Sequence, residues 1–198
     1  MSEHYFTPDP SAPHRPREVT LRALGMTLIM HTDAGVFSAD GLDPGSKLLM
    51  ESLPPLTGRV ADLGCGWGAM GVPLALKNPG AEFILVDINE RAVSLARKNI
   101  ALNQAKNAVA ITGDGLAAVP QGLDAVVTNP PIRAGKQVIY GLFEQAREKL
   151  APGGKLYIVI RKQQGAPSAL KFLQELFAAA QVIERGGGYW VIEATKEA

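Results

Sequence analysis

One stretch of the sequence restricts the fold more than any other. Residues 60–63 (Val-Ala-Asp-Leu) form a short apolar run with one acid, and residues 64–68 (Gly-Cys-Gly-Trp-Gly) follow directly. This order predicts a buried strand, a glycine turn and a helix that starts near Ala69. Glycines let the backbone of such a turn approach a ligand closely, and free N–H groups at a helix start favour an anionic group. We therefore expect a small ligand with a carboxylate or a phosphate over this turn.

From residue 59 onward, strand-like and helix-like segments alternate along the chain. The apolar patterns predict strands over 59–63, 82–87, 108–112, 123–128, 155–160, 181–184 and 189–194, and helices over about 69–77, 89–103, 137–149 and 168–179. Such alternation indicates a parallel sheet with right-handed crossovers and helices on both faces. Three glycines at 186–188 form a tight turn, which makes the last two strands antiparallel neighbours. We expect an α/β fold: a doubly wound, Rossmann-like, mostly parallel sheet of seven strands with one late antiparallel strand.

The N-terminal part of the chain has a different pattern. Prolines among polar residues predict a flexible arm over residues 1–17. Alternating apolar residues around Gly25 predict a β-hairpin over 18–31, and a helix that starts near Asp43 ends before Pro54-Pro55. We expect a single domain over residues 18–198, in which 18–55 are a small flank and 56–198 are the core.

Composition limits the class of protein. The chain has 198 residues, 46% of them hydrophobic, which suits one α/β domain with a large core. It has one cysteine, no apolar run of membrane-span length and a polar N-terminus, so we expect a cytoplasmic protein in a reducing compartment. The net charge of +1 shows no basic surplus, and three isolated histidines predict no metal site. A monomer is the favoured oligomeric state.

Two ligands are compatible with the glycine turn. Gly64, Gly66 and Ala69 fit the G-x-G-x-x-[G/A] pattern, and Asp87 follows at roughly the right distance for a ribose hydroxyl, so a nicotinamide or flavin cofactor is allowed. Two details favour S-adenosylmethionine. Asp62 precedes the first glycine by two residues, as in the D-x-G-x-G-x-G loop of class I methyltransferases. Residues 129–131 (Asn-Pro-Pro) follow a later strand, where a dehydrogenase has no use for them.

Four polar residues fall at the ends of four predicted strands. Ligands of open α/β sheets bind beyond the carboxyl ends of the strands, so we expect Asp62, Asp87, Asp114 and Asn129 to form one site. There Asp87 would accept both ribose hydroxyls, Ile88 would pack on the adenine face, and Asp114 would accept a hydrogen bond from the adenine amino group. The glycine loop would hold the methionine end, and we interpret the thiol of Cys65 as a packing group.

The Asn129-Pro130-Pro131 turn predicts the reaction. Two prolines remove two N–H donors, which leaves carbonyl groups free to accept hydrogen bonds, and the Asn129 side-chain oxygen adds another acceptor. Such acceptors suit an –NH₂ group on a base ring or an acyl group, because they hold its hydrogens and aim its lone pair at a sulfonium methyl. Fixed approach would supply much of the rate, and no strong general base is needed.

These motifs resemble the methyltransferase small domain family of class I S-adenosylmethionine-dependent methyltransferases. Residues 35–38 (Gly-Val-Phe-Ser), 43–49 and 129–136 narrow the resemblance to this family, whose best-known members are ribosomal RNA guanine-N2 methyltransferases. The resemblance runs from about residue 17 to the C-terminus. It implies Asn129, Pro130 and Pro131 as the catalytic turn. It implies a cofactor site made of Phe37, Asp62, Gly64, Cys65, Gly66, Gly68, Asp87, Ile88, Asp114, Gly115 and Asn129.

The predicted substrate is an exocyclic guanine amino group in ribosomal RNA. Ile132, Arg133, Lys136 and Lys162 are the candidate substrate-binding residues, and basic side chains after 160 could contact phosphates. A guanine amino group lies in the minor groove of a duplex, so the target would be single-stranded or flipped out. Three alternatives stay open: a protein glutamine amide as acceptor, a cofactor-binding partner subunit of another methyltransferase, and a nicotinamide-dependent oxidoreductase. Glutamine-type enzymes usually carry an aromatic residue after the Asn-Pro-Pro turn, where this sequence has Ile132.

Overall fold

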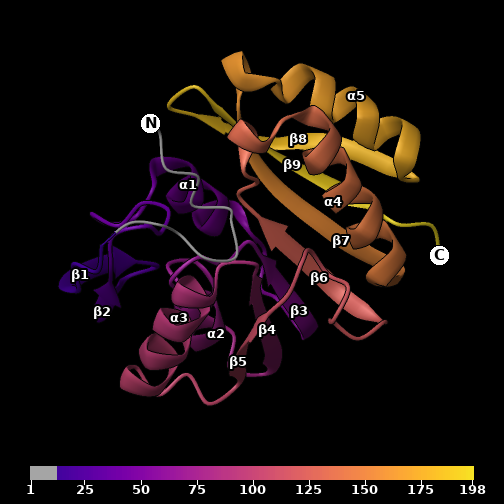
Figure 1. The fold of residues 1–198 in the computed structure, drawn as a ribbon. Coiled ribbons are helices and arrows are strands. Elements are labelled where there is room, and N and C mark those ends of the chain that lie inside the picture. Colours follow the sequence, from indigo (N-terminus) through magenta and orange to yellow (C-terminus); the bar gives the residue numbers. More distant parts are fainter. Residues whose placement is uncertain (1–12) are drawn as a thin grey trace.

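Seven strands form the central sheet of the computed structural model, which describes residues 13–198 (Figure 1). The first twelve residues of the predicted arm therefore lie outside the described residues. The strand order is β5-β4-β3-β6-β7-β9-β8, and only β9 runs antiparallel to its neighbours. The strands are β3 (Gly58–Leu63), β4 (Ala81–Asp87), β5 (Ala108–Thr112), β6 (Leu123–Thr128), β7 (Leu150–Arg161), β8 (Ala179–Gly186) and β9 (Tyr189–Thr195). This arrangement confirms the predicted fold class.

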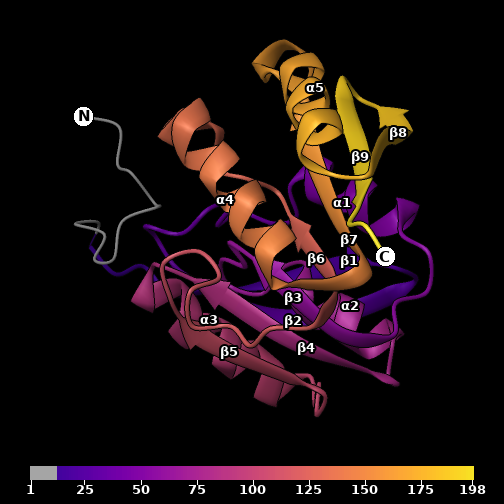
Figure 2. The same cartoon turned by 90° about the vertical axis from the view of Figure 1, so that its right-hand side faces the viewer.

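Helices cover both faces of this sheet (Figures 1 and 2). Successive side chains of a strand point to opposite faces, so each central strand contributes to two buried clusters. In β3, Val60 joins one cluster, and Ala61 and Leu63 join the other. The helices are α1 (Pro44–Ser52), α2 (Gly71–Lys77), α3 (Glu90–Leu102), α4 (Lys136–Lys149) and α5 (Ala166–Leu176), with short 3₁₀ turns η1 (Ile132–Ala134) and η2 (Lys162–Gln164).

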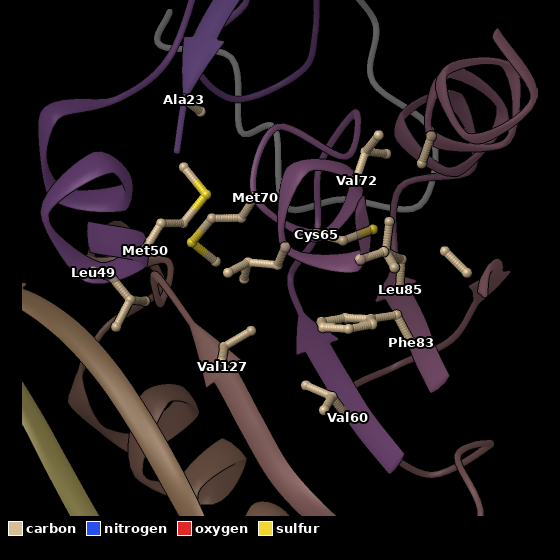
Figure 3. Packing of buried hydrophobic residues seen from close by; sticks show 14 of the residues in the cluster. Ala23, Leu49, Met50, Val60, Cys65, Met70, Val72, Phe83, Leu85 and Val127 are labelled. Carbon is tan, nitrogen blue, oxygen red and sulfur yellow. The ribbon is translucent and has the colours of Figure 1, made fainter. Parts of the chain in front are cut away.

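The first cluster joins the N-terminal flank to the core. Figure 3 shows Met50 of α1 and Met70 of the glycine loop meeting Val60, Phe83 and Val127 from three strands of the sheet. These five residues are at most 5% exposed. The second cluster lies under α4 and α5 on the opposite face. Because α1 is part of a shared core, its position relative to the strand ends is fixed by packing.

The predicted N-terminal hairpin is present. Strands β1 (Arg17–Ala23) and β2 (Met26–Thr32) pair antiparallel through a two-residue turn at Leu24 and Gly25, both with positive φ. The hairpin is a separate sheet that packs on α3, where the Asn99 amide exchanges two hydrogen bonds with the backbone of His31. Asn103 adds a third bond, from its amide nitrogen to the Ile29 carbonyl.

Several predicted boundaries were wrong, three of them near irregular backbone or a buried side chain. Helix α2 begins at Gly71 instead of near Ala69, because the glycine loop continues through Gly68, where φ is +87°. Helix α5 ends at Leu176 instead of 179, since Phe177 turns extended and its side chain is buried in the second cluster. Strand β7 begins at Leu150 instead of 155, because Leu150 pairs with Leu123; residues 152–154 (Pro-Gly-Gly) form an irregularity within the strand.

Two kinds of feature are absent from the described part of the chain. None of the helices between residues 13 and 198 has the length and apolar character needed to span a bilayer. Over the same residues, no group of three or more His, Cys, Asp or Glu side chains is arranged so that it could hold a metal ion.

Candidate active site

A cavity of about 580 Å³ lies at the carboxyl ends of the parallel strands. The predicted site residues that line it are Phe37, Gly64, Gly66, Asp87, Ile88, Asp114, Gly115, Asn129, Pro130, Pro131, Ile132 and Arg133. Five predicted residues do not line it: Asp62, Cys65, Gly68, Lys136 and Lys162. Cys65 lines a much smaller adjoining cavity of about 30 Å³, and the two lysines are exposed outside the main cavity. The structure thus brings the glycine loop and the Asn-Pro-Pro turn into one space.

The glycine loop is held by the neighbouring strand β4. The N–H groups of Gly64 and Cys65 both donate to the Val86 carbonyl, and the Gly66 N–H donates to Asp87 Oδ2 at 2.8 Å. Gly64 and Gly66 have φ of +73° and +55°, in the left-handed region that glycine adopts most readily. A Cβ placed on either residue would meet no atom within 4 Å. Glycine is therefore favoured here by backbone conformation, and the space above the loop stays open to a ligand.

Asp87 connects the loop to the helix that follows. Its Oδ1 accepts from the Asn89 N–H at 2.9 Å, while Oδ2 accepts from Gly66. Burial raises the pKa of this carboxyl, and the N–H groups of Asn89 and Gly66 lower it in part. Each oxygen keeps a lone pair for a further donor, so the carboxyl at the cavity wall can accept two hydroxyl groups of a ligand.

Asp62 lies behind the loop and not in the cavity. Its side chain is fully buried, and among residues 13–198 neither of its oxygens has a hydrogen-bond partner of ordinary geometry. A Cβ on Gly71, in the first turn of α2, would lie 2.7 Å from Asp62 Oδ2. Burial raises the pKa of Asp62 to about 7; the Gly71 N–H lowers it in part, and the charge of Asp87 raises it further. Contact between Asp62 and a ligand in the large cavity would have to be indirect.

Another part of the wall is apolar and includes an aromatic side chain. Ile88 and Val86 lie on the wall next to Asp87, and Asp114 and Gly115 follow β5. Phe37 lies on a loop, and its backbone carbonyl accepts a hydrogen bond from Nε1 of the buried Trp67 at 3.0 Å. The buried Trp67 thus anchors this loop through its indole N–H. An apolar wall beside a carboxylate suits a nucleoside, whose flat base and hydroxyl groups need these two environments.

The Asn-Pro-Pro turn follows β6 and faces helix α1. The Asn129 amide nitrogen donates to Asp43 Oδ2 and to Ser46 Oγ, both at 3.0 Å. Asp43 is also the N-cap of α1, because the same Oδ2 accepts from the Ser46 N–H at 2.9 Å. Asp43 was not among the predicted site residues. Its capping position before Pro44 was visible in the sequence, but its contact with a residue 86 positions away was not.

Arg161 and Tyr189 complete the cavity at the edge formed by β7 and β9. The Arg161 Nε donates to the Tyr189 hydroxyl at 2.8 Å, and the guanidinium lies 4.6 Å from the centre of the tyrosine ring. Gln164 and Arg133 also line the cavity. The sequence indicated Arg161 only as one of several basic residues after the strand, and Tyr189 was missed. Their pairing depends on the antiparallel register that places the two residues opposite each other.

Comparisons with known proteins identify the family of this chain. The family model of the methyltransferase small domain matches residues 27–193. The chain belongs to the methyltransferase small domain family. This finding confirms the resemblance to S-adenosylmethionine-dependent methyltransferases that the motifs predicted.

The proteins similar to this chain include ribosomal RNA methyltransferases. The Bacillus subtilis protein YbxB, an uncharacterized protein, is 39% identical over 200 residues, which cover 99% of this chain and all of YbxB. Ribosomal RNA large subunit methyltransferase G of Pseudomonas putida is 38% identical over 96% of this chain and 51% of its own length. Among solved structures, the T. thermophilus 16S rRNA N2 methyltransferase RsmC, in complex with AdoMet and guanosine, has a TM-score of 0.83 and 32% identity.

The matches differ in how much of the relative they cover. This chain spans about half the length of the named ribosomal RNA methyltransferases: 93% of it matches 52% of the RsmC chain. The comparison therefore addresses only the matched half of these relatives.

Proposed function

We propose that this protein is an S-adenosylmethionine-dependent methyltransferase that modifies the exocyclic N2 amino group of a guanine in ribosomal RNA. One observation carries the proposal: a single cavity has the glycine loop and Asp87 on one wall and the Asn129-Pro130 turn on another. The likeness to RsmC, whose structure contains AdoMet and guanosine, supports both the cofactor and the acceptor.

The residues on the first wall fit S-adenosylmethionine. Asp87 keeps lone pairs for the ribose hydroxyls, Ile88 offers an apolar surface for adenine, and Asp114 can accept from the adenine amino group. The open space above Gly64 and Gly66 leaves room for the methionine end. When bound there, the cofactor supplies a methyl group on a positively charged sulfur.

The second wall fits an amino group as acceptor. Pro130 and Pro131 have no N–H, so the turn presents acceptors without competing donors. The Asn129 side-chain oxygen and the Pro130 carbonyl would hold the two amino hydrogens of the base. This hold directs the nitrogen lone pair toward the cofactor side of the cavity. Fixed orientation of two reactants supplies much of a methyl-transfer rate, and the nitrogen loses its proton readily once it carries a fourth substituent.

Cationic side chains on the rim suit RNA. Arg133 and Arg161 line the cavity and are exposed, and Lys136 and Lys162 lie just outside it on the following turns. Such residues contact phosphates and fix the position of a flipped-out nucleotide without reading its sequence. Ile132 lines the cavity where a base would enter.

Transfer of radiolabelled methyl from S-adenosylmethionine to total RNA from a strain that lacks this gene tests the proposal. The RNA is then digested to nucleosides, and the wild type is compared with Asn129→Ala. Label in N2-methylguanosine that the variant does not produce is the expected result. Label only in added protein extract would replace RNA with a glutamine-type acceptor. Cofactor binding without any transfer would replace the enzyme with a cofactor-binding partner subunit.

A further inference from the structure

The side-chain amide of Asn129 is fixed by a helix that lies far away in the sequence. Its nitrogen donates to Asp43 Oδ2 and to Ser46 Oγ, both at 3.0 Å, across sequence separations of 86 and 83 residues. Asp43 is the N-cap of α1. Ser46 is the third residue of this helix and is buried. We propose that Asp43 is a positioning residue that sets the orientation of the Asn129 amide so that its oxygen, and not its nitrogen, faces the acceptor. This inference rests on the proposed function.

The chemistry of the two partners gives them different tasks. An ionised carboxylate only accepts hydrogen bonds, so a reversed Asn129 amide would place its oxygen against the oxygen of Asp43. The Ser46 hydroxyl both donates and accepts, so it tolerates either orientation. Asp43 therefore selects the orientation, whereas Ser46 only fixes the position. Donation to a charged acceptor also polarises the amide, which strengthens its oxygen as an acceptor for an amino group.

The local backbone prepares this contact. Asp43 and Asn129 each precede a proline, and a residue before proline is restricted to extended conformations. Asp43 accordingly has φ −62° and ψ 136°, the geometry of an N-cap. Gly45 also restricts this region, because a Cβ at this position would lie 2.9 Å from Asp43 Oδ2 and 2.7 Å from Tyr189 Cε1. Only glycine leaves room here for the carboxylate and the tyrosine ring together.

Two substitutions separate the positioning role from the capping role. Asp43→Asn keeps a good N-cap, but its amide can offer either an oxygen or an NH₂ to Asn129, so the orientation is lost. We expect kcat to fall about tenfold or more, as for one lost charge-assisted hydrogen bond, with KM for RNA and Kd for S-adenosylmethionine within about twofold. Ser46→Ala should lower kcat only about threefold. Ser46→Thr, which keeps the hydroxyl, should restore it.

Matched controls come from the same elements. Ser52→Ala removes a serine hydroxyl that bonds the Leu48 carbonyl in the last turn of α1. Asp124→Asn changes an aspartate at the other end of β6, where it accepts from the Arg59 N–H. Both should keep wild-type kcat. Unchanged kcat in Asp43→Asn, or losses of kcat that simply follow the thermal stability of the five variants, would overturn the positioning role.

A second measurement does not depend on any substrate. In ¹⁵N NMR spectra the Asn129 side-chain NH₂ signal is assigned by its absence in Asn129→Asp. We expect slow exchange of these protons with water in the wild type and fast exchange, or two sets of signals, in Asp43→Asn. Fast exchange in the wild type would overturn the inference. Protected protons in a wild type that methylates no RNA would leave the inference standing and refute the proposed function instead.

Discussion

The glycine-loop wall and the Asn-Pro-Pro wall of the cavity are held in different ways. The glycine-loop wall is fixed by strand β4, which follows it closely in sequence, through the Val86 carbonyl and the Asp87 carboxylate. The Asn-Pro-Pro wall is fixed by residues from distant parts of the chain: Asp43 holds Asn129, and Tyr189 holds Arg161. The cofactor wall is therefore a local unit, whereas the acceptor wall exists only after the whole domain has folded.

The largest effect should come from Asn129. Asn129→Ala removes the proposed acceptor oxygen of the reacting amino group, so we expect kcat to fall about 10²–10³-fold, as for removal of one preorganised polar group. Kd for S-adenosylmethionine should stay within about threefold, because the cofactor wall is held separately. Single-turnover methyl transfer and calorimetry measure the two quantities. Asn103→Ala, which loses bonds to the hairpin and to the Asn99 carbonyl far from the cavity, is the matched control. Equal losses in kcat and cofactor affinity would show that the two walls are one unit.

Asp62, behind the cofactor wall, should make the free energy of unfolding of the protein depend on pH. Its pKa is raised from 3.8 to about 7 by burial, so between these values the folded state binds more protons than the unfolded state. Stability then falls as pH rises through this window, by at most about 1.4 kcal/mol per pH unit, and levels off above the folded pKa. We expect about 2 kcal/mol of loss between about pH 5 and pH 7.

Urea unfolding at these two pH values measures this loss, with Asp62→Asn as the comparison. The variant should lose most of the pH dependence and keep a remainder from Asp87, whose pKa is also raised. A wild type that gains stability as pH rises over this window would contradict the buried position of Asp62.

Asp87 should affect cofactor affinity and not the chemical step. Asp87→Asn puts an NH₂ group where an oxygen now accepts the N–H of Gly66 or of Asn89 and would accept a ribose hydroxyl of the cofactor. We expect Kd for S-adenosylmethionine to rise about tenfold, the effect of one charge-assisted hydrogen bond, while kcat at saturating cofactor changes little. Glu82→Gln, at the exposed start of the same strand, is the control. A large loss of kcat at saturation would contradict the separation of the walls.

The same contrast explains what the sequence could predict. The glycine loop, Asp87, Asp114 and the Asn-Pro-Pro turn were expected at one sheet edge because parallel strands bring their carboxyl ends together. Asp43, Tyr189 and the partners of Arg161 were not, since each acts across a contact that only the folded register and the packing of α1 create. Asp62 was expected in the ligand site, but it does not line the cavity and lies beside Gly71 behind the glycine loop. The spacing of residues in the motif does not reveal this position.

The smallest effect should come from Tyr189. Tyr189→Phe removes the hydroxyl that accepts from Arg161 Nε but keeps the ring under the guanidinium, so the charge stays near its place. We expect KM for RNA to rise about threefold with kcat and salt dependence unchanged, as for one neutral hydrogen bond. Arg161→Gln, in contrast, removes a charge, so the slope of log affinity against log salt concentration should become shallower by about 0.7–0.9. Tyr189 also touches the space at Gly45, beside Asp43. A loss of kcat in Tyr189→Phe, with KM unchanged, would therefore show that the tyrosine supports the orientation of Asn129 more than the binding of RNA.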